Sequence, residues 1–147
     1  MMPRKIAVLA LAGLLSVGAA AAFADAMSPE SAVAARQAAM KEDGKVLRGA
    51  SNLTGDKAVA VLTTVHKNYT ELPSLFPKDS VTDKSIAKPI IWEQFDQFSA
   101  IFKKGADAAA AGIAAAKAGD TAKYKEAVEA VASTCNECHQ TYRTKES

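Results

Sequence analysis

Four stretches of apolar residues at helical spacing follow one another along the chain, and helix-breaking residues separate them. The first begins at Ser28-Pro29-Glu30, which provides a capping hydroxyl, a proline for the first helical position and an acidic residue for the positive helix end. It is expected to end near residues 49–55. The second begins near Asp56 and ends at Leu72-Pro73. Its apolar stripe recurs at steps of three and four residues: Val59, Leu62, His66 and Tyr69.

Two further helices are predicted beyond a polar, proline-containing loop at residues 73–88. The third begins around Pro89 and ends at Gly119, and its alanine-rich part offers a small surface that a neighbouring helix can approach closely. Asp120 caps the fourth, whose apolar seam runs at steps of four and three: Tyr124, Val128, Val131, Cys135, Cys138 and Tyr142. No segment alternates with period two, so the sequence predicts an all-α fold, an antiparallel up-down-up-down four-helix bundle.

The first 24 residues have the three parts of a secretory signal peptide. Arg4 and Lys5 form the positive region, residues 6–15 are apolar, and Ala22-Phe23-Ala24 provides the small residues of a cleavage site. A buried N-terminal helix is the alternative. We therefore expect a cleaved signal peptide at residues 1–24, a four-helix-bundle domain at residues 25–147, and export to the periplasm.

Charge and composition narrow the classes of function. Two of the 18 basic residues and none of the 16 acidic residues fall within residues 1–24, so the exported chain would carry no net charge. A nucleic-acid-binding protein would present a basic face, so we expect no nucleic-acid partner. No stretch after residue 24 is apolar enough for a bilayer span, so we expect no membrane span in the mature chain.

The chemistry is concentrated in Cys135-Asn136-Glu137-Cys138-His139, a C-x-x-C-H motif of the kind that attaches c-type haem. On a helix the two cysteines and the histidine occupy positions i, i+3 and i+4, so all three share one face. The two thiols can add across the two vinyl groups of a haem, and His139 can bind the iron as its proximal ligand. The motif predicts one covalently attached haem c per chain.

A zinc site and a redox dithiol or disulfide are the alternatives for this motif. A zinc site needs four ligands, and His66 is the only other histidine in the chain. A thioredoxin-like C-x-x-C opens a helix in a βαβ unit, whereas this motif falls near the end of the last predicted helix. A disulfide across so short a loop adds little stability.

The stretch from Cys135 to Tyr142-Arg143 resembles the haem segment of the class II c-type cytochromes, the cytochrome c′ family. Lys88-Pro89-Ile90-Ile91-Trp92 is similar to the family's entry to its third helix, and residues 72–77 are similar to the loop before it. Arg36-Gln37-Ala38-Ala39-Met40 is similar to the haem-pocket run of its first helix. The resemblance spans the whole exported chain and implies thioether bonds at both cysteines of the motif.

The resemblance also implies which residues surround the haem. Arg36 and Gln37 would lie against it, with Arg36 near a propionate, and Ser85 and Ile86 would lie where the chain passes the haem edge. Met40 would point at the distal side of the iron. Because residues 40–44 look more like those of the low-spin, His/Met members, we expect Met40 to be the sixth ligand. Apolar packing of Met40 is the alternative, and ligation by His66 is less favoured than either.

Together these expectations describe a periplasmic mono-haem cytochrome that carries single electrons between redox partner proteins, since His/Met ligation raises the haem potential. The alternative is a five-coordinate cytochrome c′ that binds nitric oxide or another diatomic gas. We expect no enzyme, because the sequence offers neither a carboxylate pair nor a nucleophile with a base. The resemblance further implies that the chain can form a homodimer through its first two helices.

Overall fold

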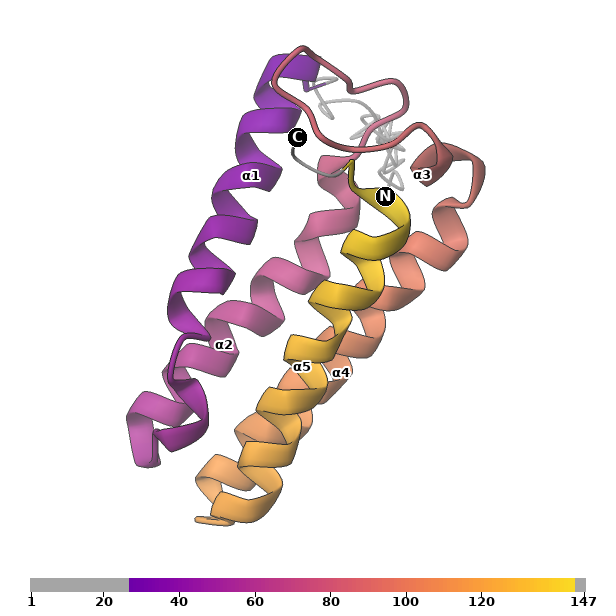
Figure 1. The fold of residues 1–147 in the computed structure, drawn as a ribbon. Helices are drawn as coiled ribbons and strands as arrows, with labels where there is room; N and C mark the ends of the chain where they lie inside the picture. The colour runs from indigo at the N-terminus through magenta and orange to yellow at the C-terminus, as the bar shows by residue number, and fades with distance from the viewer. Residues whose placement is uncertain (1–26, 145–147) are drawn as a thin grey trace, which may run out of the picture.

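Four long helices form the fold. The computed structural model describes residues 27–144, so the predicted signal peptide at residues 1–24 lies outside the described part. The long helices are α1 (Pro29–Val46), α2 (Gly55–Glu71), α4 (Phe95–Lys117) and α5 (Thr121–Tyr142). Successive long helices run in opposite directions (Figure 1). The predicted antiparallel up-down-up-down four-helix bundle is therefore confirmed.

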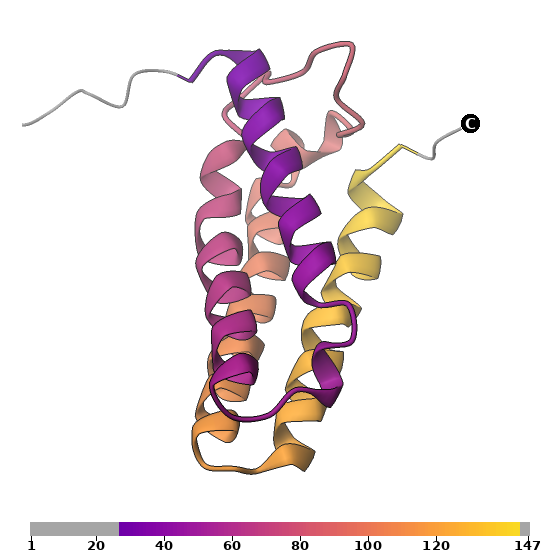
Figure 2. The same cartoon turned by 90° about the vertical axis from the view of Figure 1, so that its left-hand side faces the viewer.

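Three short elements join the long helices: η1 (Ala50–Asn52), η2 (Leu72–Leu75) and α3 (Ile90–Glu93). The longest connection runs from η2 to α3 across one end of the bundle (Figures 1 and 2). Between residues 27 and 144 there is no strand, only an isolated antiparallel bridge between Ala87 and Arg143. None of the helices in this part of the chain combines the length and apolar character that a membrane span requires.

The predicted helix starts are supported by capping hydrogen bonds. The Ser28 side chain accepts from the Ser31 amide at 3.2 Å, and the Asp120 side chain accepts from the Lys123 amide at 3.0 Å. Such caps satisfy donors that have no partner within the helix. Gly119, with a φ of 73°, makes the turn between α4 and α5.

The third helix departs from the prediction of one continuous helix from Pro89. It breaks at Gln94, where φ is −123° and ψ is 40°. The break separates α3 from α4 and lets the Trp92 indole donate to the carbonyl oxygens of Phe76 and Pro77, at 3.1 and 3.0 Å. At the break itself the Gln94 side chain accepts from the Tyr142 hydroxyl at 3.3 Å. Contacts with the loop and with α5 therefore interrupt the helix.

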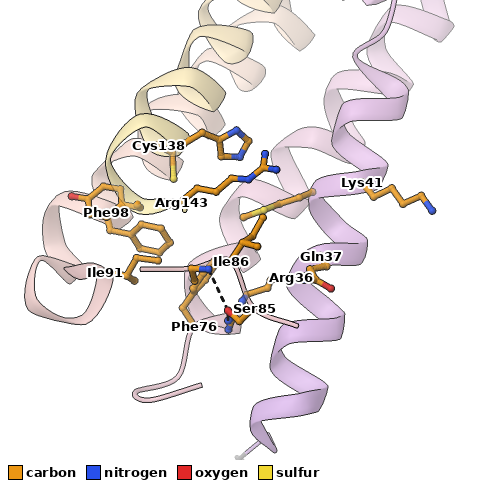
Figure 3. Close-up of a pocket in the computed structure, with 14 residues that line it drawn as sticks. Arg36, Gln37, Lys41, Phe76, Ser85, Ile86, Ile91, Phe98, Cys138 and Arg143 are labelled. Atoms are coloured by element: carbon orange, nitrogen blue, oxygen red, sulfur yellow. Dashed lines mark hydrogen bonds between the residues drawn. The ribbon is translucent and has the colours of Figure 1, made fainter. Parts of the chain in front are cut away.

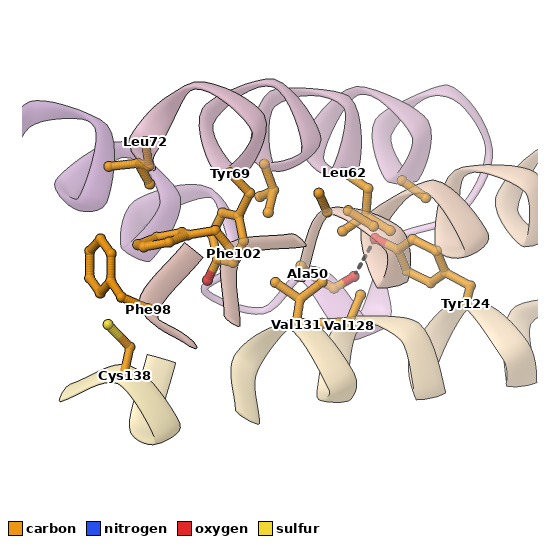
Figure 4. Packing of buried hydrophobic residues seen from close by; sticks show 14 of the residues in the cluster. Ala50, Leu62, Tyr69, Leu72, Phe98, Phe102, Tyr124, Val128, Val131 and Cys138 are labelled. Carbon is orange, nitrogen blue, oxygen red and sulfur yellow. Dashed lines mark hydrogen bonds between the residues drawn. The ribbon is translucent and has the colours of Figure 1, made fainter. Parts of the chain in front are cut away.

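The core is centred on α4, which packs closely against α2 and α5 (Figure 4). Gly105 and Gly112 allow this approach, because a Cβ at Gly105 would overlap the Tyr69 ring and one at Gly112 would overlap Leu62. The Phe98 ring lies 4.7 to 5.2 Å from three other rings, each in an edge-to-face arrangement: Phe76, Phe102 and Tyr142. The α2–α4–α5 part of the bundle is thus tightly packed.

By contrast, α1 packs chiefly on α2 and η2 and makes hardly any direct contact with α5. The loop before α3 closes one end of the resulting space. It is held there because the Lys88 amide donates to the Tyr142 carbonyl at 2.9 Å, and the Thr144 amide donates to the Ile86 carbonyl at 2.8 Å. The fold therefore leaves a gap between α1 and α5 and covers it at the loop end.

Candidate functional site

Two cavities occupy the space between α1 and α5. The larger, of about 450 Å³, lies toward the loop and is lined from α1, the loop, α4 and α5 (Figure 3). The smaller, of about 260 Å³, lies deeper between α1, α2, α4 and α5. Both are lined by Met40, Cys138 and His139. The cavities are thus neighbours along a single slot that the C-x-x-C-H helix borders.

The α5 wall carries the three motif residues. Cys138 is buried and lines both cavities, whereas Cys135 is half-buried and lines only the smaller one. Burial raises the pKa of the Cys138 thiol to about 12, and the charges of Cys135 and Glu137 add to the increase. That thiol is therefore neutral at physiological pH.

His139 is exposed on the face of α5 that borders the slot. Partial burial lowers the pKa of its imidazole, and the positive charge of Arg143 lowers it further. Both effects favour neutral imidazole, the form that binds iron. The helix therefore brings the two thiols and a neutral imidazole to one slot, as the spacing predicts.

Arg36 forms the α1 wall at the loop end and is almost fully buried. Its Nη1 atom donates to the Leu75 carbonyl at 3.2 Å and to the Ser80 hydroxyl at 2.8 Å. Its Nη2 atom donates to the Ser80 carbonyl at 2.7 Å and to the Ser85 hydroxyl at 2.9 Å. The guanidinium also lies 4.5 Å from the centre of the Phe76 ring. All four Nη hydrogens are thus directed at the loop.

The other predicted residues of this region also line the larger cavity. Gln37 is exposed, and its amide donates to the Lys84 carbonyl at 2.8 Å. Ser85 and Ile86 are half-buried on the loop. Met40 is half-buried and packs against the hydrophobic core. The structure therefore brings together all eight residues for which the sequence predicts a site role, whereas His66 on α2 lines neither cavity.

Sequence reasoning missed a buried polar group at the smaller cavity. The Asp43 side chain is 4% exposed, and its Oδ1 atom accepts from the Asn68 amide at 2.9 Å, but its Oδ2 atom has no partner. The Asn68 amide also donates to Glu42 at 2.9 Å. The signal was present, because Arg36, Met40 and Asp43 lie on one helix face at steps of four and three.

Ser80 was missed as well. It is 1% exposed and receives two of the four Arg36 bonds. It lies in an irregular loop, where burial follows no period, so no sequence pattern marks it.

The slot fits a haem, a flat apolar ring with two carboxylates at one edge. The larger cavity has an apolar lining that includes Phe76, Ile91 and Phe98, and its other charged residues are all basic: Arg36, Lys41 and Arg143. Cys138 borders both cavities, and Cys135 borders only the smaller, deeper one. An attached ring would thus have its vinyl edge at α5 and its carboxylates near positive charge.

Comparison with known proteins decides the family. A family model described as Cytochrome C′ matches residues 21–143. The chain belongs to the cytochrome c′ family. Its predicted resemblance to that family is therefore confirmed, and the chain binds one covalently attached haem c. Haem c replaces the zinc and dithiol alternatives for the motif.

Curated relatives and solved structures agree with this assignment. The chain is 34% identical to cytochrome c′ of Pararhodospirillum photometricum, over 79% of this chain and 98% of the relative. It is 39% identical to cytochrome c-556 of Agrobacterium tumefaciens, over 68% of this chain and 80% of the relative.

Among solved structures, cytochrome c′ from Rhodopseudomonas palustris aligns with a TM-score of 0.69 and 30% identity, over 79% of this chain and 98% of that one. A ferrous variant of cytochrome c′ from Alcaligenes xylosoxidans aligns with a TM-score of 0.64 and 26% identity, over 81% and 98% of the two chains. That structure holds bound nitric oxide.

The family assignment corrects the predicted function. Cytochromes c′ have a five-coordinate haem iron and bind gases, so the His139/Met40 electron carrier is wrong, and so is the likeness to low-spin His/Met members. The prediction failed because a methionine on this helix face can either bind the iron or pack against apolar residues, and the sequence pattern is the same in both cases. In the structure, Met40 packs against the core. Cytochromes c′ are periplasmic, often dimeric, and usually not enzymes.

Proposed function

We propose that this protein binds nitric oxide, or another neutral diatomic gas, at a five-coordinate haem in the periplasm. The observation that carries the proposal is the apolar composition of the slot beside Met40, which includes Phe76, Ile86 and Phe98. A neutral diatomic molecule needs no charged partner, so such an apolar surface admits it. The relative from Alcaligenes xylosoxidans, with nitric oxide bound, supports the same assignment.

Cys135 and Cys138 would hold the haem through thioether bonds, and His139 would hold its iron from the α5 side. When bound, the haem would supply an iron that can bind the gas. The low pKa of His139 keeps its imidazole neutral and available to the metal. The helix fixes the three residues on one face, so attachment and ligation share a single rigid element.

Met40 would fill the distal side without binding the iron. Its side chain packs against the core, and it is the α1 residue that lines both cavities. A flexible thioether in that position limits the size of molecule that enters and keeps water out. The packing of Met40 would then determine how large a ligand can reach the iron.

The loop end of the slot would hold the haem carboxylates. Lys41 and Arg143 line this end, and Gln37 and Ser85 line it beside them. Because the Arg36 Nη hydrogens are directed at the loop, Arg36 contributes mainly by fixing Ser85 and its neighbours, together with a positive charge near the carboxylates.

Visible spectroscopy of the reduced protein tests the proposal. We expect a broad, high-spin spectrum that changes at once when carbon monoxide or nitric oxide is added. Sharp, split bands that resist carbon monoxide would contradict it. The matched variant His66→Ala should bind gas as the wild type does, because His66 lines neither cavity.

Export and assembly complete the proposal. Cleavage at Ala24 would release the chain into the periplasm, where a redox partner protein would keep the iron ferrous for gas binding. Two chains would associate as a homodimer through α1 and α2. N-terminal sequencing of the purified protein tests the cleavage, and sedimentation velocity with and without gas tests the dimer.

A further inference from the structure

Asp43 is a buried carboxyl group that the proposed gas site does not use. It lies on α1 one turn beyond Met40, and it lines the smaller cavity together with Tyr69, Thr134 and Cys135. Only one of its oxygens is paired. Leaving a buried polar atom without a partner costs free energy, so folding gives no reason to keep an ionisable side chain here.

The surroundings of Asp43 raise the pKa of its carboxyl group toward neutral pH. Its pKa is raised to about 6: burial raises it most, the hydrogen bond from Asn68 partly offsets this, and the charge of Glu42 adds to the increase. The α4 side of the cavity is apolar, formed by Ile101 and Phe102. Solvent therefore screens this carboxyl group poorly from a charge within the slot.

Other ionisable groups face the same cavity. Glu42 on α1 is exposed and does not line the cavity, but it shares the Asn68 amide with Asp43. From α2 there is Tyr69, whose pKa is raised above its usual value by burial and by its contact with Cys135. From α5 there are Cys135, Cys138 and His139. Once the haem is attached, the two sulfurs no longer carry protons and His139 is committed to the iron. Asp43 is left as the buried group that can exchange a proton near pH 6.

We infer that Asp43 takes up a proton when the haem iron is reduced. An external one-electron donor, in the assay an electrode with a redox dye, supplies the electron to the ferric iron. A proton from water adds to the carboxylate of Asp43, so the slot gains one negative and one positive charge. Removing positive charge from the iron favours the neutral carboxyl, which gives the coupling its direction. The inference rests on the proposed haem attachment at Cys135 and Cys138.

The test is a spectroelectrochemical titration of the haem-loaded protein between about pH 5 and about pH 8, which brackets this carboxyl. Full coupling changes the reduction equilibrium tenfold per pH unit, which is about 59 mV for one electron. We expect the wild-type reduction potential to fall as pH rises between about 5 and about 8, with a slope that approaches about 59 mV per pH unit. Asp43→Asn should flatten the slope there, and Glu42→Gln, which changes the neighbouring exposed acid, should keep it.

Two outcomes overturn the inference: a wild-type potential that does not vary with pH, or an Asp43→Asn variant that retains the wild-type slope. The second outcome would assign the proton to the haem carboxylates. Infrared difference spectroscopy of the wild type does not depend on the variant folding. The reduced-minus-oxidised spectrum should gain a protonated carboxylic acid band that shifts in heavy water, and its absence would also overturn the inference.

Mass spectrometry of the same sample separates this inference from the proposed attachment. A chain without covalent haem contradicts the attachment. A chain with covalent haem and a flat pH dependence contradicts only the role of Asp43.

Discussion

The hydrogen bonds of Arg36 should stabilise the loop that covers the slot, and the substitution Arg36→Met tests this. The side chain is 3% exposed, and two of its four bonds, both to Ser80, are fully buried. Hydrogen bonds that involve a charged group contribute about 1.5–3 kcal/mol each, so losing two costs about 3–6 kcal/mol. Methionine refills much of the volume and removes a buried charge, whose desolvation already lowers the pKa of Arg36. We expect a net loss of about 2–4 kcal/mol.

Thermal unfolding of the haem-loaded protein measures this loss. For a chain of this length 1 kcal/mol corresponds to about 4 °C, so the Tm of Arg36→Met should fall by roughly 8–16 °C. Hydrogen exchange should show where the change lies: amides of residues 77–88 should exchange faster, and those of α4 should not. Arg36→Lys should lose part of the stability, because one ammonium group cannot reproduce the guanidinium fork.

The matched control is Arg48→Met, the same substitution at an exposed arginine beyond the end of α1. It should change stability by no more than about 0.5 kcal/mol. If Arg36→Met unfolds at the same temperature as Arg48→Met, or if the loop amides exchange at the wild-type rate, the stabilising role of Arg36 is refuted. In that case the hydrogen bonds from Arg36 to Ser80 make no net contribution to the stability of the folded protein.

Three further predictions follow from the same site. Replacing both Cys135 and Cys138 by alanine should make the haem extractable with acid acetone, whereas the wild-type haem should resist. Met40→Ala should leave the visible spectra of both oxidation states unchanged, because the iron does not bind Met40, and should speed carbon monoxide binding about tenfold; a changed ferrous spectrum would contradict this. Since the folded state raises the pKa of Asp43 to about 6, stability should fall as pH rises from about 4 through 6, by about 1–3 kcal/mol; calorimetry of Asp43→Asn should show that loss removed.

The sequence predicts the helices well, because each of their buried faces has a period. The α5 seam is buried at Tyr124, Val128, Val131, Cys138 and Tyr142, and only Cys135 is partly open. The break at Gln94 has no local signal, since neither glycine nor proline occurs there. It depends on the Trp92 and Tyr142 bonds, which link segments far apart in the chain.

The sequence predicts those site residues whose types have a distinctive chemistry. The motif and Arg36 were identified, yet the guanidinium partners on the loop were not, because hydrogen bonds to Ser80 depend on tertiary structure. Asp43 was missed because a charged side chain in a polar run is usually solvated, although its helix face also carries Met40. The role of Met40 was wrongly predicted because ligation and packing place the same side chain on the same face.

The uneven packing of the bundle explains why α1 tolerates the buried polar residues Arg36 and Asp43. The close packing that Gly105 and Gly112 permit lies in α2, α4 and α5, where a Cβ would overlap Tyr69 or Leu62. That part contains most of the buried hydrophobic cluster, against which α1 packs through partly buried residues. The α1 helix can therefore carry a buried arginine and a buried carboxyl on the face that borders the slot. A substitution at Gly112, whose Cβ would meet Leu62 away from both cavities, should therefore lower stability while leaving the haem spectrum intact. Changes on α1 should alter gas binding, potential or loop closure, because α1 and α5 line the slot in which we propose that the haem lies.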